Sequence, residues 1–211
     1  MLAELAAQAS LRNRQRKLAL FMEAMRPGPD TRIVDVGVGD TGFGTEPGVA
    51  ASHNFFEALY PWPEQITAVS DVPLPNFSRA FPRVRCVTAS GTELPFEDDA
   101  FDIAFSNAVV EHVGERSVQR RFVAELCRVA PRVFVSTPNR WFPVETHTLV
   151  PLAHWLPRGS RDRVFEALRC DSWRGVELLS RRELVDLFPP GMEPRVVESR
   201  ITTTIAASRT S

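Results

Sequence analysis

The sequence has little of what marks secreted, membrane-spanning or nucleic-acid-binding proteins. Its three cysteines are odd in number and widely spaced, which gives neither a disulfide framework nor a metal-binding pattern. The formal net charge is −1, so no overall basic field attracts nucleic acid. No apolar run approaches the roughly twenty residues of a membrane span, and the charged N-terminus does not match a signal peptide. These absences favour a cytoplasmic protein without metal, nucleic acid or stable membrane insertion.

What is present suits one folded domain. With 211 residues and 44% hydrophobic content, the chain can bury a full core but is too short for two substantial domains. We expect a single domain over residues 1–211 that begins with a helix within residues 1–30. That helix carries four basic residues, Arg12, Arg14, Arg16 and Lys17. They could form a local basic patch for nucleic acid, but we favour the interpretation that they form the solvent-exposed face of a helix packed against the domain.

The run TRIVDVGVGDTGFG at residues 31–44 is the most informative segment. The apolar residues Ile33, Val34 and Val36 predict a buried strand of a parallel sheet. Gly37 and Gly39 then allow a tight turn and a close approach to a ligand. Open α/β sheets bind ligands at such a turn, where Asp35 can accept hydrogen bonds from a cofactor or from the loop. Glycine-rich turns also occur without a ligand, so this run alone leaves both interpretations open.

A second acid follows a second strand. Ile66–Val69 predicts a strand that ends at Asp71, about thirty residues after the glycine turn. This acid can hold a ribose, or it can simply terminate a strand. The spacing exceeds the roughly twenty residues of a dinucleotide fingerprint. We therefore expect an enlarged loop within residues 40–60, of the kind that often contributes to binding.

Residues 90–113, SGTELPFEDDAFDIAFSNAVVEHV, follow a third predicted strand at Arg85–Thr88. With the preceding motifs they resemble the class I S-adenosylmethionine-dependent methyltransferases, in particular the small-molecule, methyltransferase type 11-like branch. There, an LPF…D…FD segment precedes a strand and an N…EH turn. The resemblance covers about residues 32–207. It implies an α/β fold with a Rossmann-like, doubly wound, mostly parallel seven-stranded sheet, and S-adenosyl-L-methionine as cofactor.

The same resemblance assigns cofactor contacts. Asp35, Gly37 and Gly39 would line the methionine part of the cofactor, and Asp71 would bind the ribose hydroxyls. The remaining assignments are Thr92, Glu93 and Leu94 along the adenine, and Asn107 and Ala108 near the amino-acid end.

The chain departs from the family pattern at two positions. Thr41 replaces the third glycine of the D-x-G-x-G-x-G pattern, with Gly42 displaced by one place. Ser90 stands where an acid often contacts the adenine amino group, so that hydrogen bond would come from Ser90 or from a backbone carbonyl.

The second half continues the alternation of helices and strands. Helical spacing predicts a helix at Gln119–Ala130, and a strand follows at Arg132–Ser136. After an insertion we expect a helix at Arg181–Phe188 and strands at Arg195–Ser199 and Thr202–Ala207. The last two are too close for a parallel crossover, which predicts a C-terminal antiparallel hairpin.

Residues 140–180 form a helical and aromatic insertion after the fifth strand, and we expect it to cap the substrate. Its first part, RWFPVETHTLVPLAHWLPRG, is rich in tryptophan, leucine and proline. In related methyltransferases this region helps to form the acceptor pocket, which implies a small, hydrophobic or lipid-like acceptor. The same aromatic residues can instead pack the cap onto the core, and both interpretations remain.

Methyl transfer from a sulfonium is an in-line displacement that depends mainly on holding donor and acceptor together in a dry pocket. An oxygen acceptor would gain from a general base, for which His112 and His147 are the candidates. Glu111 and His112, which we place at a helix start, can equally serve capping or packing.

Three functions therefore remain open: a methyltransferase, which the ordered motifs favour; a nicotinamide-dependent oxidoreductase; and a non-catalytic cofactor-binding protein that keeps the fold. The sequence does not indicate an oligomeric state.

Overall fold

The computed structural model describes residues 2–40, 54–144, 148, 150–170, 173 and 175–210, without the side chains of residues 2–11 and 158. Within this part of the chain, seven strands form one sheet in the order β3-β2-β1-β4-β5-β7-β6. β1 to β5 are parallel, and β7 pairs antiparallel with both β5 and β6. The strands are β1 Ile33–Val36, β2 Ile66–Ser70, β3 Arg85–Thr88, β4 Ile103–Asn107, β5 Arg132–Pro138, β6 Met192–Ser199 and β7 Thr202–Arg209.

This topology confirms the predicted Rossmann-like sheet with its C-terminal antiparallel hairpin. All residues of β1 and β2 are buried, as is typical of central parallel strands covered on both faces. The predicted strands lie where expected, within a few residues at their ends. Asp35 is the one ionisable residue within β1, and Ala68 and Phe105 are its partners on the neighbouring strands.

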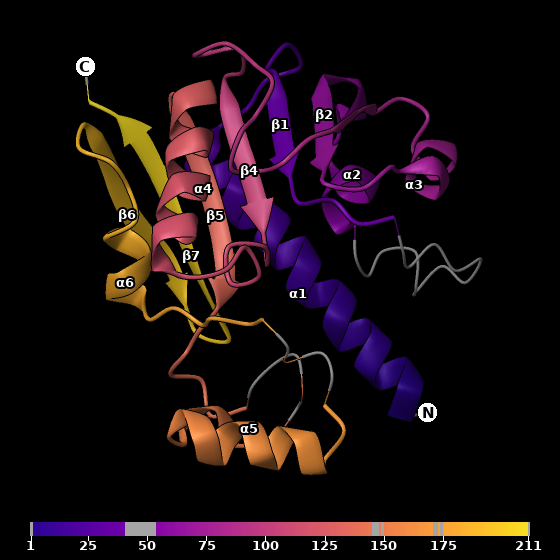
Figure 1. Cartoon of the computed structure of the whole chain (residues 1–211). Coiled ribbons are helices and arrows are strands. Elements are labelled where there is room, and N and C mark those ends of the chain that lie inside the picture. The colour runs from indigo at the N-terminus through magenta and orange to yellow at the C-terminus, as the bar shows by residue number, and fades with distance from the viewer. Residues whose placement is uncertain are drawn as a thin grey trace.

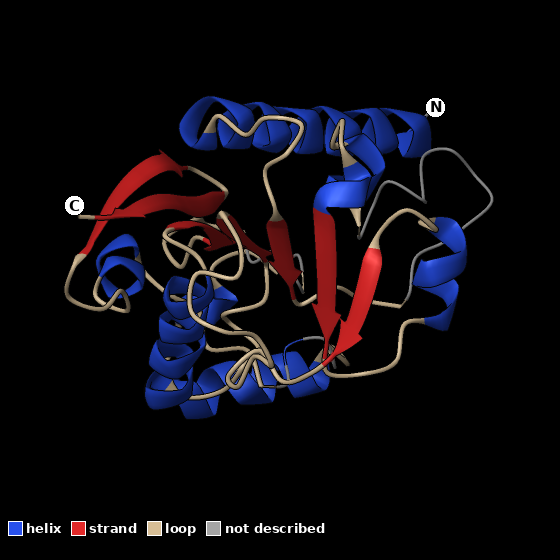
Figure 2. Cartoon of the chain, turned by 90° about the horizontal axis from the view of Figure 1, so that it is seen from above, coloured by secondary structure: helices blue, strands red, loops and turns tan. Residues whose placement is uncertain are grey.

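Helices cover both faces of the sheet (Figures 1 and 2). α1 (Leu2–Met25), α2 (Phe55–Leu59) and α3 (Pro75–Ala80) pack on one face, and α4 (Arg116–Val129) and α6 (Arg181–Val185) on the other. Phe21 of α1 packs edge-on against Phe56, Phe105 and Phe134, with ring centroids 5.0 to 5.6 Å apart. This aromatic contact fixes α1 and α2 against the central strands.

Two helices differ from the sequence prediction. α4 begins at Arg116, so Glu111 and His112 lie in a turn before the helix and not at its start. Gly114, with φ +118°, lies between this turn and Glu115, the N-cap of α4, and this backbone conformation favours glycine. α6 ends at Val185 instead of Phe188, and its start is fixed by a capping box between Ser180 and Glu183.

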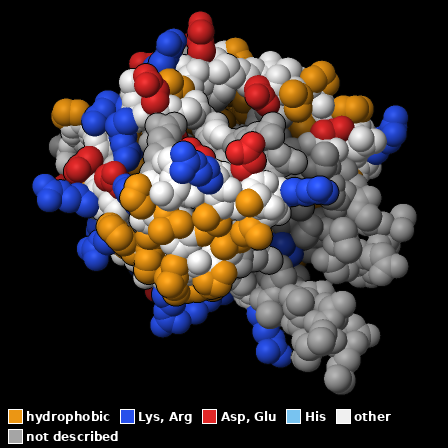
Figure 3. Space-filling model, turned by 60° about the horizontal axis from the view of Figure 1, so that its bottom comes forward, with side chains coloured by type: hydrophobic (Ala, Val, Ile, Leu, Met, Phe, Trp, Pro, Cys, Tyr) orange, Lys and Arg blue, Asp and Glu red, His pale blue; other side chains and the backbone are white. Residues whose placement is uncertain are grey.

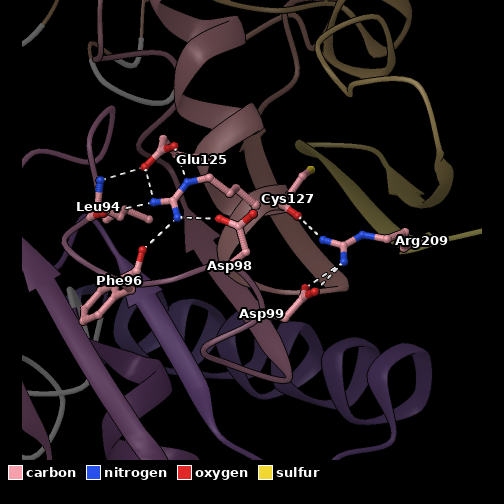
Figure 4. A network of polar contacts seen from close by, with 8 residues as sticks. Leu94, Phe96, Asp98, Asp99, Glu125, Cys127 and Arg209 are labelled. Atoms are coloured by element: carbon pink, nitrogen blue, oxygen red, sulfur yellow. Dashed lines mark hydrogen bonds and ion pairs between the residues drawn. The ribbon is translucent and has the colours of Figure 1, made fainter.

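One arginine holds the LPF segment in place (Figure 4). Arg128 of α4 donates to the carbonyl oxygens of Leu94 at 3.0 Å and Phe96 at 2.7 Å. It also pairs with Asp98 at 3.0 Å and with Glu125 at 2.7 Å. These charge-assisted hydrogen bonds satisfy the carbonyls of an irregular segment that joins β3 to β4, so the segment keeps one shape.

The insertion after β5 contains a short 3₁₀ helix, η2 (Ala153–Trp155), and α5 (Arg158–Ala167). α5 lies beyond the ends of the strands, at the bottom of Figure 1, on the side to which the parallel strands point. A small core of its own contains Ala153, Phe165, Trp173 and Val176. In the part of the chain that the structure describes, no helix is long and apolar enough to cross a membrane.

Candidate functional site

A cavity of about 450 Å³ lies at the carboxyl ends of the parallel strands. This is the edge at which open α/β sheets bind ligands. The cavity brings together residues that follow β1, β2, β3 and β4, which are far apart in the sequence. Six of the residues predicted from sequence line it: Gly37, Asp71, Ser90, Thr92, Ala108 and His112.

Gly37 occupies a position that other residues cannot take. Its φ is +102°, and its N–H donates to the carbonyl oxygen of Val69 at 2.9 Å. A Cβ placed on it would lie 2.2 Å from Cγ2 of Val109, which also lines the cavity. The turn after β1 therefore requires glycine both for its backbone conformation and for its space.

The other side of the cavity carries the polar groups after β2 and β3. Asp71 is exposed directly after β2. Ser90 and Thr92 are joined through their hydroxyls at 2.9 Å, and the N–H of Thr92 donates to Oγ of Ser90 at 3.2 Å. Between them, a Cβ on Gly91 would lie 2.6 Å from Phe122, so the backbone packs closely against α4. The lining of the cavity therefore includes one exposed carboxylate and a short turn that carries two hydroxyls.

The segment that follows β4 contributes Ala108 and His112 to the lining of the cavity. Ala108 adopts φ +57°, which is unusual for a residue with a side chain, and its N–H donates to the carbonyl oxygen of Ser136 at 2.7 Å. His112 is exposed at the cavity, and its N–H donates to the carbonyl oxygen of Val109 at 2.8 Å. Strained backbone of this kind is concentrated at functional sites.

Two more predicted residues, Asp35 and Asn107, line a much smaller cavity of about 20 Å³. Gly37 and Val38 line both cavities, so the two adjoin at the glycine turn. Asp35 is 6% exposed and hydrogen-bonded to Glu57 of α2. Burial, and then the neighbouring Glu57 carboxyl, raise the pKa of Asp35 well above its ordinary value.

The remaining predicted residues lie apart from the two cavities or outside the described residues. Glu93 is exposed and faces Arg121 at 3.9 Å, while Leu94 is buried in the core. The carbonyl oxygen of Gly39 accepts a hydrogen bond from Asn54 at 3.0 Å. His147, Thr41 and most of the enlarged loop at residues 40–60 lie outside the described residues.

Sequence reasoning missed Lys17, because the solvated-face interpretation of α1 is wrong at this position. Lys17 is 8% exposed, and its Nζ donates to Oδ1 of Asn107 at 2.6 Å. Burial lowers the pKa of Lys17 to about 8, although the charges of Glu111 and Glu198 act in the opposite direction. The signal was present, because Lys17 shares one helical stripe with the buried Phe21 four residues later.

The cap contains a larger cavity, of about 600 Å³. Phe165, Trp173 and Val176 give it an apolar wall, and Arg161 lies over the Trp173 ring at 5.0 Å. Glu177, which lines this cavity, donates its N–H to the carbonyl oxygen of Glu111 at 2.8 Å. Glu111 directly precedes His112, so the wall of the cap cavity is joined to the wall of the cavity at the strand ends.

Comparison with known proteins supports the family resemblance. Residues 34–132 match a family model described as a methyltransferase domain. This match supports the resemblance to the class I S-adenosylmethionine-dependent methyltransferases that the sequence motifs carry. The match supports S-adenosyl-L-methionine as the cofactor. A search of curated proteins finds no match.

Solved structures share the fold at low sequence identity. Geranyl diphosphate C-methyltransferase from Streptomyces coelicolor, in complex with Mg²⁺, geranyl diphosphate and S-adenosyl-L-homocysteine, is 15% identical with a TM-score of 0.60. The similarity covers 97% of this chain and 82% of that one. The N-methyltransferase NodS from Bradyrhizobium japonicum, in complex with S-adenosyl-L-homocysteine, is 12% identical with a TM-score of 0.57, over 93% and 86% of the two chains.

A third similar structure, from Rhodobacter sphaeroides, is described as a Zn-dependent alcohol dehydrogenase. It is 13% identical with a TM-score of 0.62, over 93% of this chain and 90% of that one. At such identity the likeness concerns the fold alone. The family match, and not the fold, therefore separates the methyltransferase interpretation from the oxidoreductase one.

Proposed function

We propose that this protein transfers a methyl group from S-adenosylmethionine to a small, hydrophobic or lipid-like acceptor, and that it does so in the cytoplasm as a single-domain enzyme. One observation carries the proposal: Gly37, Asp71, Thr92 and Ala108, which follow four different strands, line one cavity at the ligand-binding edge of a methyltransferase-family sheet.

In the proposed complex the cofactor spans both cavities at this edge. The carboxylate of Asp71 accepts hydrogen bonds from the ribose hydroxyls, and the Ser90–Thr92 turn lies beside the adenine. The amino-acid end passes Gly37 toward Asp35 and Asn107. Support comes from the strand order β3-β2-β1-β4, since these residues lie at the carboxyl ends of neighbouring strands and line the two cavities there.

The cap is the proposed acceptor site. Its cavity combines the apolar side chains of Phe165, Trp173 and Val176 with charged ones, and the N–H of its lining residue Glu177 donates to the carbonyl oxygen of Glu111, the residue before His112. The cap also exposes large hydrophobic side chains, among them Trp141 at 63% and Leu152 at 50%. Figure 3, with the bottom of Figure 1 turned forward, shows hydrophobic side chains gathered on this face of the molecule. An acceptor with an apolar body suits this environment.

Chemically, the cofactor supplies an activated methyl group, and the protein holds the acceptor in line with it. The cap residues exclude water from the reacting atoms, which favours displacement of a sulfonium leaving group. His112 lines the strand-end cavity, and in the proposed mechanism its imidazole takes a proton from an oxygen acceptor.

Replacement of Asp71 by alanine tests the ribose contact. We expect the dissociation constant for S-adenosylhomocysteine to rise about 10- to 100-fold, because a hydrogen bond to a charged group contributes about 1.5–3 kcal/mol. Isothermal titration calorimetry measures this. Asp30→Ala is the matched control, since Asp30 is an exposed acid before β1, at the opposite edge of the sheet. Equal affinities of the two variants would contradict the assignment.

Replacement of His112 by glutamine tests its proposed role as a general base. With an oxygen acceptor, kcat should fall about 100-fold or more. Affinity for S-adenosylhomocysteine should change little. Single-turnover methyl transfer with a radiolabelled cofactor and a panel of hydrophobic acceptors provides the measurement. An unchanged kcat with an oxygen acceptor would remove His112 from the mechanism.

A non-catalytic cofactor-binding protein is the second candidate, because Ser90 offers a hydroxyl where the family often has an acid for the adenine. The same acceptor panel separates the two functions. Binding of S-adenosylhomocysteine without methyl transfer to any acceptor of the panel would favour this second candidate.

A further inference from the structure

Large hydrophobic side chains that stay exposed are concentrated on the cap. Seven such side chains are exposed among the described residues, and five of them belong to the cap: Trp141, Leu152, Trp155, Leu156 and Leu168. A sixth, Ile201, lies in the turn between β6 and β7. The N–H of Asn139 donates to the carbonyl oxygen of Ile201 at 2.9 Å, so this turn adjoins the start of the cap. Single exposed apolar residues are normal, but a group of them marks an interaction surface.

The structure holds part of this group in fixed positions. The indole N–H of Trp155 donates to the carbonyl oxygen of Arg140 at 2.7 Å, and the rings of Trp155 and Trp141 lie 6.3 Å apart. Trp155 thus satisfies its one polar hydrogen within the protein and stays 43% exposed. Leu152 has a φ of +61°, which is unfavourable for leucine, and its N–H donates to the carbonyl oxygen of Pro143 at 2.8 Å. Strained backbone that presents an apolar side chain at the surface indicates a function for that side chain.

Arginines lie around Trp141. Arg181 and Arg182, at the start of α6, line a cavity of about 440 Å³ together with it. The guanidinium of Arg140 lies 5.8 Å from the centre of its ring. Arg200 is exposed in the turn between β6 and β7. In Figure 3, basic side chains lie around the hydrophobic ones of this face. The apolar group therefore has a basic rim.

The positive charge of this rim is not cancelled by nearby acids. Glu183 faces Arg140 at 3.2 Å, and Asp186 faces Arg182 at 4.0 Å, so these two acids are already paired. Residues 140–182 contain eight arginines and five acids, in a chain whose formal net charge is −1. The cap region is thus basic within an otherwise acidic chain. Such a surface complements an anionic partner and disfavours contact with a second copy of itself.

We propose that this surface docks the enzyme on anionic lipid bilayers. Trp141, Leu152 and Trp155 enter the headgroup region, where tryptophan is favoured, and the arginines contact the anionic headgroups. Such binding is peripheral and reversible, and it needs no membrane-spanning segment. The cap lies on the side to which the parallel strands point (Figure 1). The docking goes beyond the proposed function, and a lipid-like acceptor would lie in the same bilayer.

Sedimentation of the full-length protein with vesicles tests the docking in the absence of cofactor. We expect binding to vesicles of equal parts phosphatidylcholine and phosphatidylglycerol, weaker binding at high salt, and little binding to phosphatidylcholine alone. Tryptophan emission should shift to shorter wavelength on binding, and less so in Trp141→Phe, because this indole leaves water for the headgroup region. Absence of binding to the mixed vesicles at low salt would overturn the proposal. Binding with unchanged tryptophan emission would also overturn it, because the contact would then lie elsewhere.

Two variants locate the contact. Leu152→Asn removes an apolar side chain and suits the left-handed backbone, and it should weaken binding to the mixed vesicles about tenfold. Arg181→Gln combined with Arg182→Gln should weaken it about 20- to 30-fold. The matched control is Arg79→Gln combined with Arg83→Gln. It removes two exposed charges before β3, the edge strand opposite β6, and should leave binding unchanged.

Equal losses in the two double variants would overturn the docking surface. A stable dimer in light scattering that Leu152→Asn dissociates, without vesicle binding by the wild type, would assign the surface to a second copy of the chain and overturn the proposal. Affinity for S-adenosylhomocysteine without vesicles should match the wild type in every variant, which also verifies the fold. Failure of docking therefore leaves the proposed function intact, and failure of cofactor binding leaves the docking intact.

Discussion

Replacement of Gly37 by valine is expected to weaken cofactor binding about 100-fold. The new Cβ would lie 2.2 Å from Val109 at a backbone φ of +102°, so the turn must move away from the cavity that it lines. Such strain and overpacking cost about 3 kcal/mol, which corresponds to about a 100-fold loss in affinity even if the fold persists. Calorimetric titration with S-adenosylhomocysteine measures the effect.

Gly159 provides the matched control for this substitution. A Cβ on Gly159, in α5, meets no atom within 4 Å, and its φ lies outside the strained range. Gly159→Val should therefore leave affinity for S-adenosylhomocysteine unchanged. Wild-type affinity of Gly37→Val, in a protein that circular dichroism shows to be folded, would contradict the role of the turn.

Replacement of Arg128 by alanine should lower the free energy of unfolding by about 2–3 kcal/mol. The change leaves the carbonyl oxygens of Leu94 and Phe96 without their donor and separates Glu125 from its cation. Side-chain hydrogen bonds from Arg128 to Glu125 and Asp98 raise the pKa of its guanidinium, so it stays charged at every pH of interest. Denaturant titration measures the loss.

Arg182→Ala is the corresponding surface control. Arg182 is 93% exposed and faces Asp186 at 4.0 Å, so its removal should cost under about 0.5 kcal/mol. Arg128→Lys should fall between the two, because an ammonium cannot bridge the carbonyls and carboxylates as the planar guanidinium does. Equal stability of Arg128→Ala and Arg182→Ala would show that the LPF segment is held by other contacts.

Most strands and the C-terminal hairpin could be predicted because their signals are local, whereas the doubly wound sheet was implied by the family resemblance. Buried β-branched residues such as those of Ile33–Val36 mark central parallel strands, and the short connection between β6 and β7 permits only a hairpin. The residues at which helices begin and end were harder to predict from the sequence. The start of α4 depends on a left-handed glycine, Gly114, and on the N-cap that follows it, which periodicity does not reveal.

The candidate site was predictable where a residue type is required by its place at a strand end. Gly37 and Asp71 are of this kind, and the structure brings both to one cavity. The contacts of Lys17 with Asn107 and of Glu57 with Asp35 were not predictable in the same way. They join residues from different elements, and only the packing of α1 and α2 on the sheet brings them together.

A crystal structure with S-adenosylhomocysteine tests the central claim most directly. The account predicts the ligand in the cavity at the strand ends, with its ribose hydroxyls on the Asp71 carboxylate and its amino-acid end past Gly37, toward Asp35 and Asn107. A ligand bound instead in the cap cavity beside Trp173, or an empty strand-end cavity at saturating ligand, would contradict it.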